Sequence, residues 1–257
     1  MTPSLKARLQ AGQICLNGWS LLPSPYVVEV YGQAGWDSVT IDMQHGMHDY
    51  ASMLASIHAL QPFGVPALVR VPWNAPGDLG RILDAGAKGV ICPMVNNAAE
   101  AAALAAACLY PPHGQRSNGP VRGADYGAAS PYQARANEEV LILPQIETAE
   151  AVSNVEEILD TPGIGGIYIG PSDLGLSHGL PAIMDRDEPE MLAIYEVLLK
   201  ATLDRGLAPA IHCTSPAYAA RMAAMGFRLV TVGTDTGAVM RASREAVSTV
   251  RKTLLAG

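Results

Sequence analysis

Eight short apolar runs alternate with segments of helical periodicity along the chain, and this alternation limits the folds open to it. The runs are continuously apolar, which is typical of parallel strands covered on both faces. Strands of that kind are joined by helices, and eight such units close most simply into a TIM (β/α)8 barrel. A length of 257 residues suits a single α/β barrel domain over residues 1–257. The strands are expected at residues 13–19, 37–41, 66–71, 89–92, 141–143, 167–170, 208–212 and 229–233.

One long segment, residues 110–137, lacks this periodicity and is rich in Pro, Gly, Arg, Asn and Ser. A loop of that length inside a compact domain is usually functional. We therefore predict a lid or an intersubunit segment, with an ordinary surface insertion as the alternative. A last helix is predicted over residues 237–255.

The overall composition narrows the class of partner. A net charge of −7 and a pI near 5.3 provide no basic stripe to replace phosphate counterions, which argues against nucleic acid. The four cysteines have no CxxC spacing and lie in apolar segments, as expected of reduced, buried thiols. The N-terminus has no apolar core of signal-peptide length, and no run reaches the roughly 20 apolar residues of a membrane span. We expect a soluble cytoplasmic protein that acts on small molecules.

Two acidic residues follow neighbouring predicted strands. Glu147 comes after residues 141–143, Asp173 comes after residues 167–170, and a helix over residues 148–159 separates them. Both carboxylates then lie at the same end of the barrel, where they repel each other unless a cation lies between them. All-oxygen ligation favours Mg²⁺ or Mn²⁺. The alternative is that each acid merely caps the helix that follows it.

Further reactive side chains lie at the C-terminal ends of other predicted strands, where TIM barrels hold their chemistry. His45 could act as a general base, with Asp42 fixing its tautomer. Arg70 suits an oxygen that develops negative charge. Together these residues predict proton removal next to a carbonyl group, with the enolate oxygen held between a metal ion and Arg70. Each also has a structural alternative: His45 as a satisfied structural histidine, Arg70 paired with a buried acid, Asp42 as a turn cap.

The remaining strand-end residues are interpreted as substrate contacts. Gln145 precedes Glu147 by two residues on the same strand face. Backbone N–H groups of Ser172 and Asp173, at a helix start, could receive a carboxylate, which fits a 2-oxo acid. Trp19 and His212 end the first and seventh strands. The other histidines, His48 among them, are expected to be surface or loop residues.

The lysines separate two classes of aldolase. A Schiff-base enzyme needs a lysine near the strand ends inside the barrel. The chain has four lysines, at positions 6, 88, 200 and 252, and Lys88 precedes the fourth strand, at the wrong end. Metal-stabilised enolate chemistry is therefore favoured over imine chemistry.

Five segments, IDMQHG, VRVPWN, LDAGAKGVICPMV, LPQIETAEA and IYIGPSDL, resemble the HpcH/HpaI family of class II pyruvate aldolases, with likeness from about Gly18 to Asp235. Members include 4-hydroxy-2-oxoheptane-1,7-dioate aldolase and 2-keto-3-deoxy-sugar-acid aldolases. The resemblance implies a TIM barrel whose last helix packs on a neighbouring subunit, commonly in a hexamer formed by two trimers. It also implies site roles: metal ligands at Glu147 and Asp173, a base dyad of His45 and Asp42, enolate stabilisation by Arg70, a pocket-lining Gln145, and an Asp84 that reaches the site across a subunit contact.

One departure from the family is Gln44, where relatives often have an acid, and another is His212, where the family often has an apolar side chain. Trp19 and His212 could therefore shape the acceptor pocket. The expected activity is reversible aldol addition or cleavage between pyruvate or hydroxypyruvate and an aldehyde, with Mg²⁺ or Mn²⁺, or else Co²⁺ or Zn²⁺. Two alternatives stay open: an acyl-coenzyme A lyase, and a 2-oxo-acid-binding subunit without catalysis.

Overall fold

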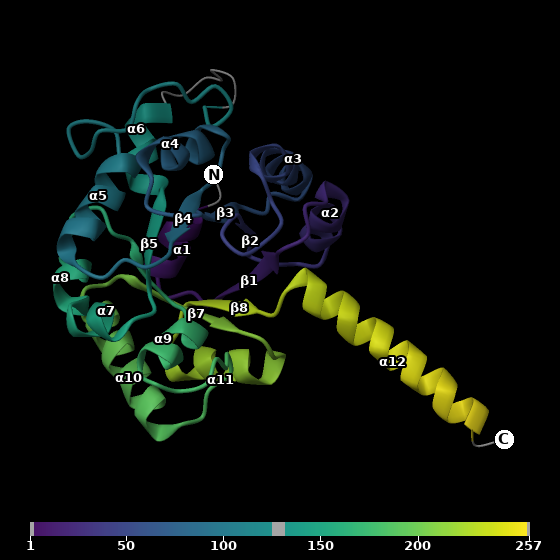
Figure 1. Cartoon of the computed structure of the whole chain (residues 1–257). Coiled ribbons are helices and arrows are strands. Elements are labelled where there is room, and N and C mark those ends of the chain that lie inside the picture. Colours follow the sequence, from purple (N-terminus) through teal and green to yellow (C-terminus); the bar gives the residue numbers. More distant parts are fainter. Residues whose placement is uncertain (1–2, 125–131, 256–257) are drawn as a thin grey trace.

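The chain closes into an eight-stranded parallel barrel in the computed structural model, which describes residues 3–124 and 132–255 (Figure 1). Each strand pairs with its neighbour in sequence, and β8 returns to pair with β1, so the TIM barrel prediction is confirmed. The strands are β1 (Cys15–Ser20), β2 (Ser38–Asp42), β3 (Ala67–Arg70), β4 (Gly89–Cys92), β5 (Leu141–Ile146), β6 (Gly166–Ile169), β7 (Ala208–Cys213) and β8 (Leu229–Val232).

Helices surround the barrel, and local sequence signals fix where several of them begin. Ser24, Asp49, Asn97 and Ser215 each accept a backbone N–H as the N-cap of the following helix. The helices are α1 (Leu5–Gln10), α2 (Pro25–Gln33), α3 (Tyr50–Leu60), a 3-10 turn η1 (Gln61–Phe63), α4 (Pro76–Asp84), α5 (Ala98–Cys108), α6 (Tyr132–Glu139), α7 (Ala149–Ser153), α8 (Val155–Leu159), α9 (Pro171–Ser177), α10 (Pro189–Asp204), α11 (Pro216–Met225) and α12 (Asp235–Leu255).

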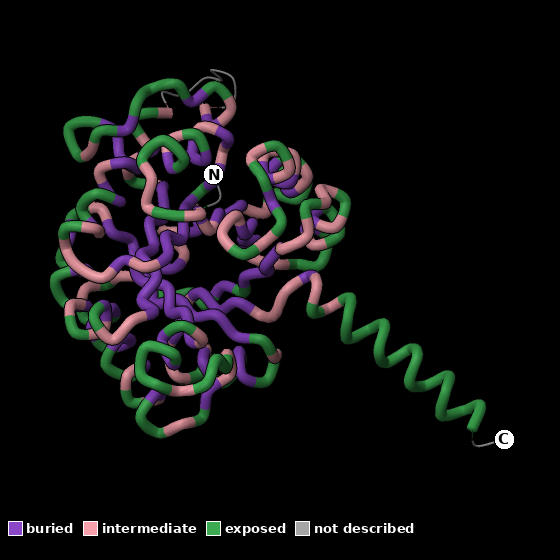
Figure 2. The backbone as a smooth tube through the Cα atoms, viewed as in Figure 1, coloured by how far each residue is buried: buried purple, intermediate pink, exposed green. Residues whose placement is uncertain are grey.

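The apolar core has two layers, which explains why the strands are apolar on both faces. One layer lies between the barrel and the surrounding helices, and the second fills the barrel interior. Leu5 and Leu9 of α1 belong to the interior layer together with Leu68 and Leu141. The strands form the buried centre in Figure 2. Polar side chains at the strand ends are therefore held by a rigid, close-packed frame.

The structure differs from the predicted elements in two places. The helix predicted over residues 148–159 is two short helices, α7 and α8, which meet at Asn154. Helix α6 lies over the end of the segment predicted to be a loop, because Ala136 packs into the core there. Residues 125–131 of that segment lie outside the described residues, so its role as a lid or intersubunit segment stays a prediction.

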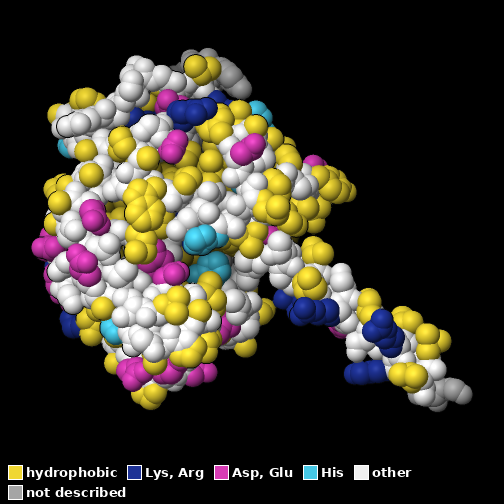
Figure 3. Space-filling view, viewed as in Figure 1, with side chains coloured by type: hydrophobic (Ala, Val, Ile, Leu, Met, Phe, Trp, Pro, Cys, Tyr) yellow, Lys and Arg dark blue, Asp and Glu magenta, His cyan; other side chains and the backbone are white. Residues whose placement is uncertain are grey.

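Helix α12 points away from the barrel (Figure 1). Asp235 is the one buried residue among those described in this helix. Figure 3 shows basic and apolar side chains along the free part of the helix. Met240, Val247, Val250 and Leu254 are each at least half exposed and recur at spacings of seven, three and four residues, so they form one apolar stripe.

All four cysteines are free and buried, as predicted. Over residues 3–124 and 132–255, no helix has the length and apolar character needed to cross a membrane.

Candidate active site

A cavity of about 450 Å³ opens at the C-terminal ends of the strands. Its walls come from β1, β2, β3, β5, β6 and β7, from segments that follow these strands, and from Thr234 after β8. Eight of the nine residues predicted for the subunit's own site line it: Trp19, Asp42, His45, Arg70, Gln145, Ser172, Asp173 and His212. Tyr168, which the sequence analysis did not single out, lines it as well.

Glu147 and Asp173 come together next to this cavity. Glu147 directly follows β5 and is only 2% exposed, while Asp173 lies in the first turn of α9 and is exposed. Burial first, and the neighbouring Asp173 charge in addition, raise the pKa of Glu147 to about 7, against the lowering effect of the Met94 N–H. Within the part of the chain that the structure describes, neither acid forms an ion pair with Lys, Arg or His.

Gln145 and Gly170 shape the immediate surroundings of Glu147. The Gln145 side-chain N–H donates to Glu147 Oε2 at 2.5 Å, and the Met94 N–H donates to Oε1 at 2.8 Å. A Cβ added at Gly170 would lie 2.7 Å from Glu147 Oε2 and 2.6 Å from Gln145 Nε2. Glycine at this position therefore lets β6 pass close to both side chains.

The residues present fit a hard divalent cation. Gln145 Oε1 is buried and has no hydrogen-bond partner among the described residues, so an acceptor oxygen stands beside the two acids. No group of three or more His, Cys, Asp or Glu side chains with metal-binding geometry occurs in residues 3–124 and 132–255. Mg²⁺ is commonly held by one or two carboxylates, with water and substrate as its other ligands. Two carboxylates and an amide oxygen therefore suffice for such an ion.

Among the described residues, Asp42 forms no hydrogen bond with the imidazole of His45, so the side-chain dyad stays a prediction. Its carboxylate accepts two hydrogen bonds from Arg70 and one from Trp19 Nε1, and it reaches His45 only through the backbone N–H. The physical reason is register: Asp42 lies opposite Arg70 on the adjacent strand. Burial would raise the pKa of Asp42, but Arg70 and the N–H groups of residues 44 and 45 bring it below its ordinary value. These contacts match two structural alternatives named from the sequence: Asp42 caps a turn, and Arg70 pairs with a buried acid.

His45 and Arg70 nevertheless both face the cavity. The guanidinium carbon of Arg70 lies 5.0 Å from the ring centroid of Trp19, whose indole is 1% exposed. The aromatic face and the Asp42 carboxylate thus fix the guanidinium in place. His45 is exposed, so its imidazole can reach a bound molecule in the cavity mouth.

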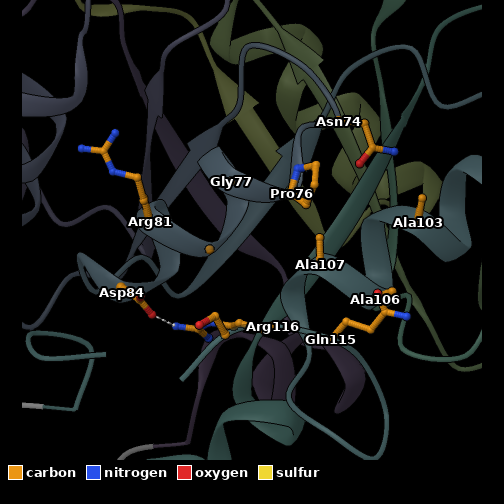
Figure 4. Close-up of a pocket in the computed structure, with 12 residues that line it drawn as sticks. Asn74, Pro76, Gly77, Arg81, Asp84, Ala103, Ala106, Ala107, Gln115 and Arg116 are labelled. Carbon is orange, nitrogen blue, oxygen red and sulfur yellow. Dashed lines mark hydrogen bonds and ion pairs between the residues drawn. The ribbon is translucent and has the colours of Figure 1, made fainter. Parts of the chain in front are cut away.

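Asp84 lies elsewhere in the chain. It ends α4 and pairs with Arg116 at 2.7 Å, beside a separate groove of about 650 Å³. Figure 4 shows this pair facing each other near Arg81 and Gln115. Asp84 is therefore absent from the lining of its own subunit's cavity, and its role across a subunit contact stays a prediction.

His48 lies in the loop between β2 and α3, but it is buried rather than at the surface. It is 6% exposed, and its Nε2 lies 3.1 Å from Ser20 Oγ, which in turn donates to Asp235 at 2.9 Å. Asp235 also accepts the N–H groups of Leu21 and Leu22. The cluster ties the start of α12 to the end of β1. Ser20 and His48 are 28 residues apart, so no sequence pattern indicates that they are in contact.

A family model described as HpcH/HpaI aldolase/citrate lyase matches residues 16–242. The chain is 38% identical over 241 residues to a hydroxypyruvate/pyruvate aldolase from Rhizorhabdus wittichii, covering 93% of this chain and 95% of the relative. It is 34% identical over 245 residues to a 4-hydroxy-2-oxo-heptane-1,7-dioate aldolase from Escherichia coli, covering 95% and 93%.

Solved structures agree with this assignment. A HpcH/HpaI aldolase/citrate lyase family protein from Burkholderia cenocepacia superimposes with a TM-score of 0.89 at 31% identity, covering 96% of this chain and 98% of that chain. A citrate lyase beta subunit from M. tuberculosis, complexed with oxaloacetate and magnesium, has a TM-score of 0.57 at 17% identity, covers 90% and 95%, and shows the fold alone. From the family model and the aldolase relatives together, we conclude that the chain belongs to the HpcH/HpaI aldolase/citrate lyase family.

Proposed function

We propose that this protein is a class II aldolase, a carbon–carbon lyase that joins pyruvate or hydroxypyruvate to an aldehyde and cleaves the product in reverse. One observation carries the proposal. Glu147 and Asp173 lie without a cationic partner, within the described residues, beside a cavity that also holds His45 and Arg70. The family and its aldolase relatives support the same reaction class.

Glu147 and Asp173 would hold the divalent metal ion, and Gln145 would orient Glu147 and offer its free oxygen. When bound, the ion supplies positive charge that stabilises the negative charge developing on the donor's oxygens. Mg²⁺ or Mn²⁺ suits the oxygen ligands best, while Co²⁺ and Zn²⁺ stay possible. The backbone N–H groups of Ser172 and Asp173 are proposed to receive the donor's carboxylate.

The protein's own groups would then move the proton. His45 removes a proton from the carbon next to the 2-oxo group, and the electron pair of that bond passes to the oxo oxygen, giving an enolate. The Arg70 guanidinium, held by Asp42 and Trp19, stabilises this negative charge. The enolate carbon then attacks the aldehyde carbon, and the new alkoxide takes up the proton that His45 had removed, which gives a hydroxyl group and returns His45 to its starting form.

We also propose that the active form is a homo-oligomer, such as a hexamer of two trimers. Helix α12 exposes an apolar stripe that a second copy of the chain would cover. In such an assembly Asp84, which lies outside the pocket of its own subunit, would reach the pocket of a neighbour.

The two other functions considered are not favoured, since the relatives that cover nearly the whole chain are named aldolases. The experiment is to incubate the protein with pyruvate and a short aldehyde, with Mg²⁺ or Mn²⁺ or with a chelator. We expect a 4-hydroxy-2-oxo acid in the presence of metal and none with the chelator. Pyruvate binding without product under every metal would instead indicate a binding subunit.

A further inference from the structure

A continuous chain of buried polar side chains crosses the barrel interior and ends at the candidate active site. Asn17 of β1 contacts Thr231 of β8, Thr231 contacts Tyr168 of β6, and Tyr168 contacts Nδ1 of His212 on β7. The first three residues are at most 1% exposed, and His212 is 6% exposed at the cavity wall. Polar groups so deep inside a barrel are costly unless each one is satisfied.

The direction of the hydrogen bonds follows from Asn17. Its side-chain oxygen accepts from Ser38 Oγ at 2.8 Å and from Thr40 Oγ1 at 3.2 Å. Its side-chain nitrogen therefore donates, to Thr40 Oγ1 and to Thr231 Oγ1, both at 2.9 Å. Because a hydroxyl group carries one proton, Thr231 accepts from Asn17 and must donate its own proton elsewhere.

Tyr168 is the other partner of Thr231 among the described residues, at 2.7 Å. If Thr231 donates to the Tyr168 oxygen, the Tyr168 hydroxyl is free to donate to His212 Nδ1 at 3.0 Å, and every proton in the chain has an acceptor. The reverse direction would leave the buried Thr231 hydroxyl without an acceptor, which costs about 1–3 kcal/mol. His212 therefore accepts at Nδ1 and carries its ring proton on Nε2.

His212 stays neutral in this position. Burial first, and the Arg70 charge in addition, lower its pKa to about 3. Its ring packs edge-on against Trp19, with centroids 4.7 Å apart, so packing and the Tyr168 hydrogen bond together fix its orientation. No hydrogen bond to Nε2 is found among the described residues, although His212 lines the cavity. A fixed, neutral N–H donor thus stands in the wall where Arg70 also lies.

We propose that His212 is a specificity-determining residue whose Nε2–H donates to a hydroxyl group of the substrate, so that hydroxylated substrates are preferred over their deoxy counterparts. The inference rests on the proposed aldolase function. The hydroxyl group could belong to the donor, as in hydroxypyruvate against pyruvate, or to the aldehyde, as in glycolaldehyde against propanal. Tyr168 acts as a positioning residue, because its hydroxyl group bonds to Nδ1 of His212 and so holds the tautomer of that ring.

The test compares kcat/KM within each of those two substrate pairs. For the metal-loaded enzyme we expect His212→Leu to reduce the preference for the hydroxylated member by about tenfold in at least one pair, the loss of one hydrogen bond. The pair that changes identifies which substrate carries the hydroxyl. His212→Gln, which keeps an N–H donor at the end of its side chain, should recover part of the preference. His58→Leu, which removes an exposed imidazole on α3, should leave both ratios unchanged.

Two outcomes would overturn the proposal. One is an unchanged ratio in both pairs for His212→Leu while the deoxy substrates are still converted. The other is the Nδ1–H tautomer of His212 in a two-bond ¹⁵N–¹H spectrum of the protein without substrate, a readout that needs no activity. Tyr168→Phe should release the tautomer in the same spectrum and should raise KM for the hydroxylated substrate more than it lowers kcat. If the wild-type enzyme does not convert even pyruvate and propanal, the proposed aldolase function is wrong. The ¹⁵N–¹H spectrum would still test the tautomer of His212 in that case.

Discussion

Asp42 and Arg70 lie opposite each other in the register of β2 and β3, and their side chains form a forked ion pair at the mouth of the barrel. Arg70 Nε donates to Asp42 Oδ1 at 2.9 Å, and Asp42 is fully buried. The pair places a permanent positive charge in the cavity wall without leaving a buried carboxylate uncompensated. It makes Asp42 a support for Arg70 rather than for the imidazole of His45.

Arg70→Ala should therefore destabilise the fold as well as the reaction. It leaves Asp42 buried without its charge partner, which costs about 3 kcal/mol in the free energy of unfolding, measured with urea at pH 7. Arg8→Ala is the matched control, because its partner Asp37 is partly exposed and its loss should cost about 1 kcal/mol or less. Adding Asp42→Asn to Arg70→Ala should restore part of the stability. If the double variant instead lost the sum of the stabilities lost in the Arg70→Ala and Asp42→Asn single variants, the account would be contradicted.

Gly170→Ala tests the close approach of β6 to Glu147. The added Cβ would push against Glu147 Oε2 and Gln145 Nε2, so we expect Mn²⁺ affinity to fall by about tenfold or more. Calorimetric titration with Mn²⁺ measures this. Gly77→Ala in α4 is the control, since a Cβ there meets nothing within 4 Å. Equal affinity in Gly170→Ala and the wild type would show that these side chains do not hold the ion.

The raised pKa of Glu147 predicts a pH dependence for the metal-free protein. Its ordinary value is 4.5, and in the folded chain it is about 7, so between these values the folded state binds the extra proton. Stability from this group is therefore present below pH 4.5 and is lost as pH rises through 7, by about 3 kcal/mol in all. Unfolding in chelator at pH 5 and pH 8 should show this loss relative to Glu147→Gln. A difference that does not change with pH would refute the assigned shift.

The apolar stripe of α12 predicts the oligomeric state. Val250→Glu should lower the assembly mass measured by light scattering, because a charge would be buried where a second copy packs. Lys252→Glu, on the opposite side of the same helix, should leave the mass unchanged. A wild-type chain that is monomeric at micromolar concentration would contradict the proposed homo-oligomer.

Sequence reasoning could predict the barrel and most of the site, because both depend on where apolar runs end. Glu147 and Asp173 follow adjacent strands, so the closed sheet brings them together. The sequence could not show which polar side chains on different strands contact each other, because those contacts depend on the register between the strands. Asp42 was therefore paired with His45, three residues away, rather than with Arg70. The contact between His48 and Ser20 was missed for the same reason, since Ser20 lies on β1.

The central claim is that Glu147 and Asp173 share one divalent ion beside a base that removes a proton from the donor. Exchange of the methyl protons of pyruvate into deuterated water, followed by proton NMR, tests it without an aldehyde. We predict exchange with Mg²⁺ or Mn²⁺, no exchange for Glu147→Ala or Asp173→Ala, and slow exchange with intact metal binding for His45→Ala. Undiminished exchange in either acid variant, or in the wild-type enzyme with a chelator, would contradict the account.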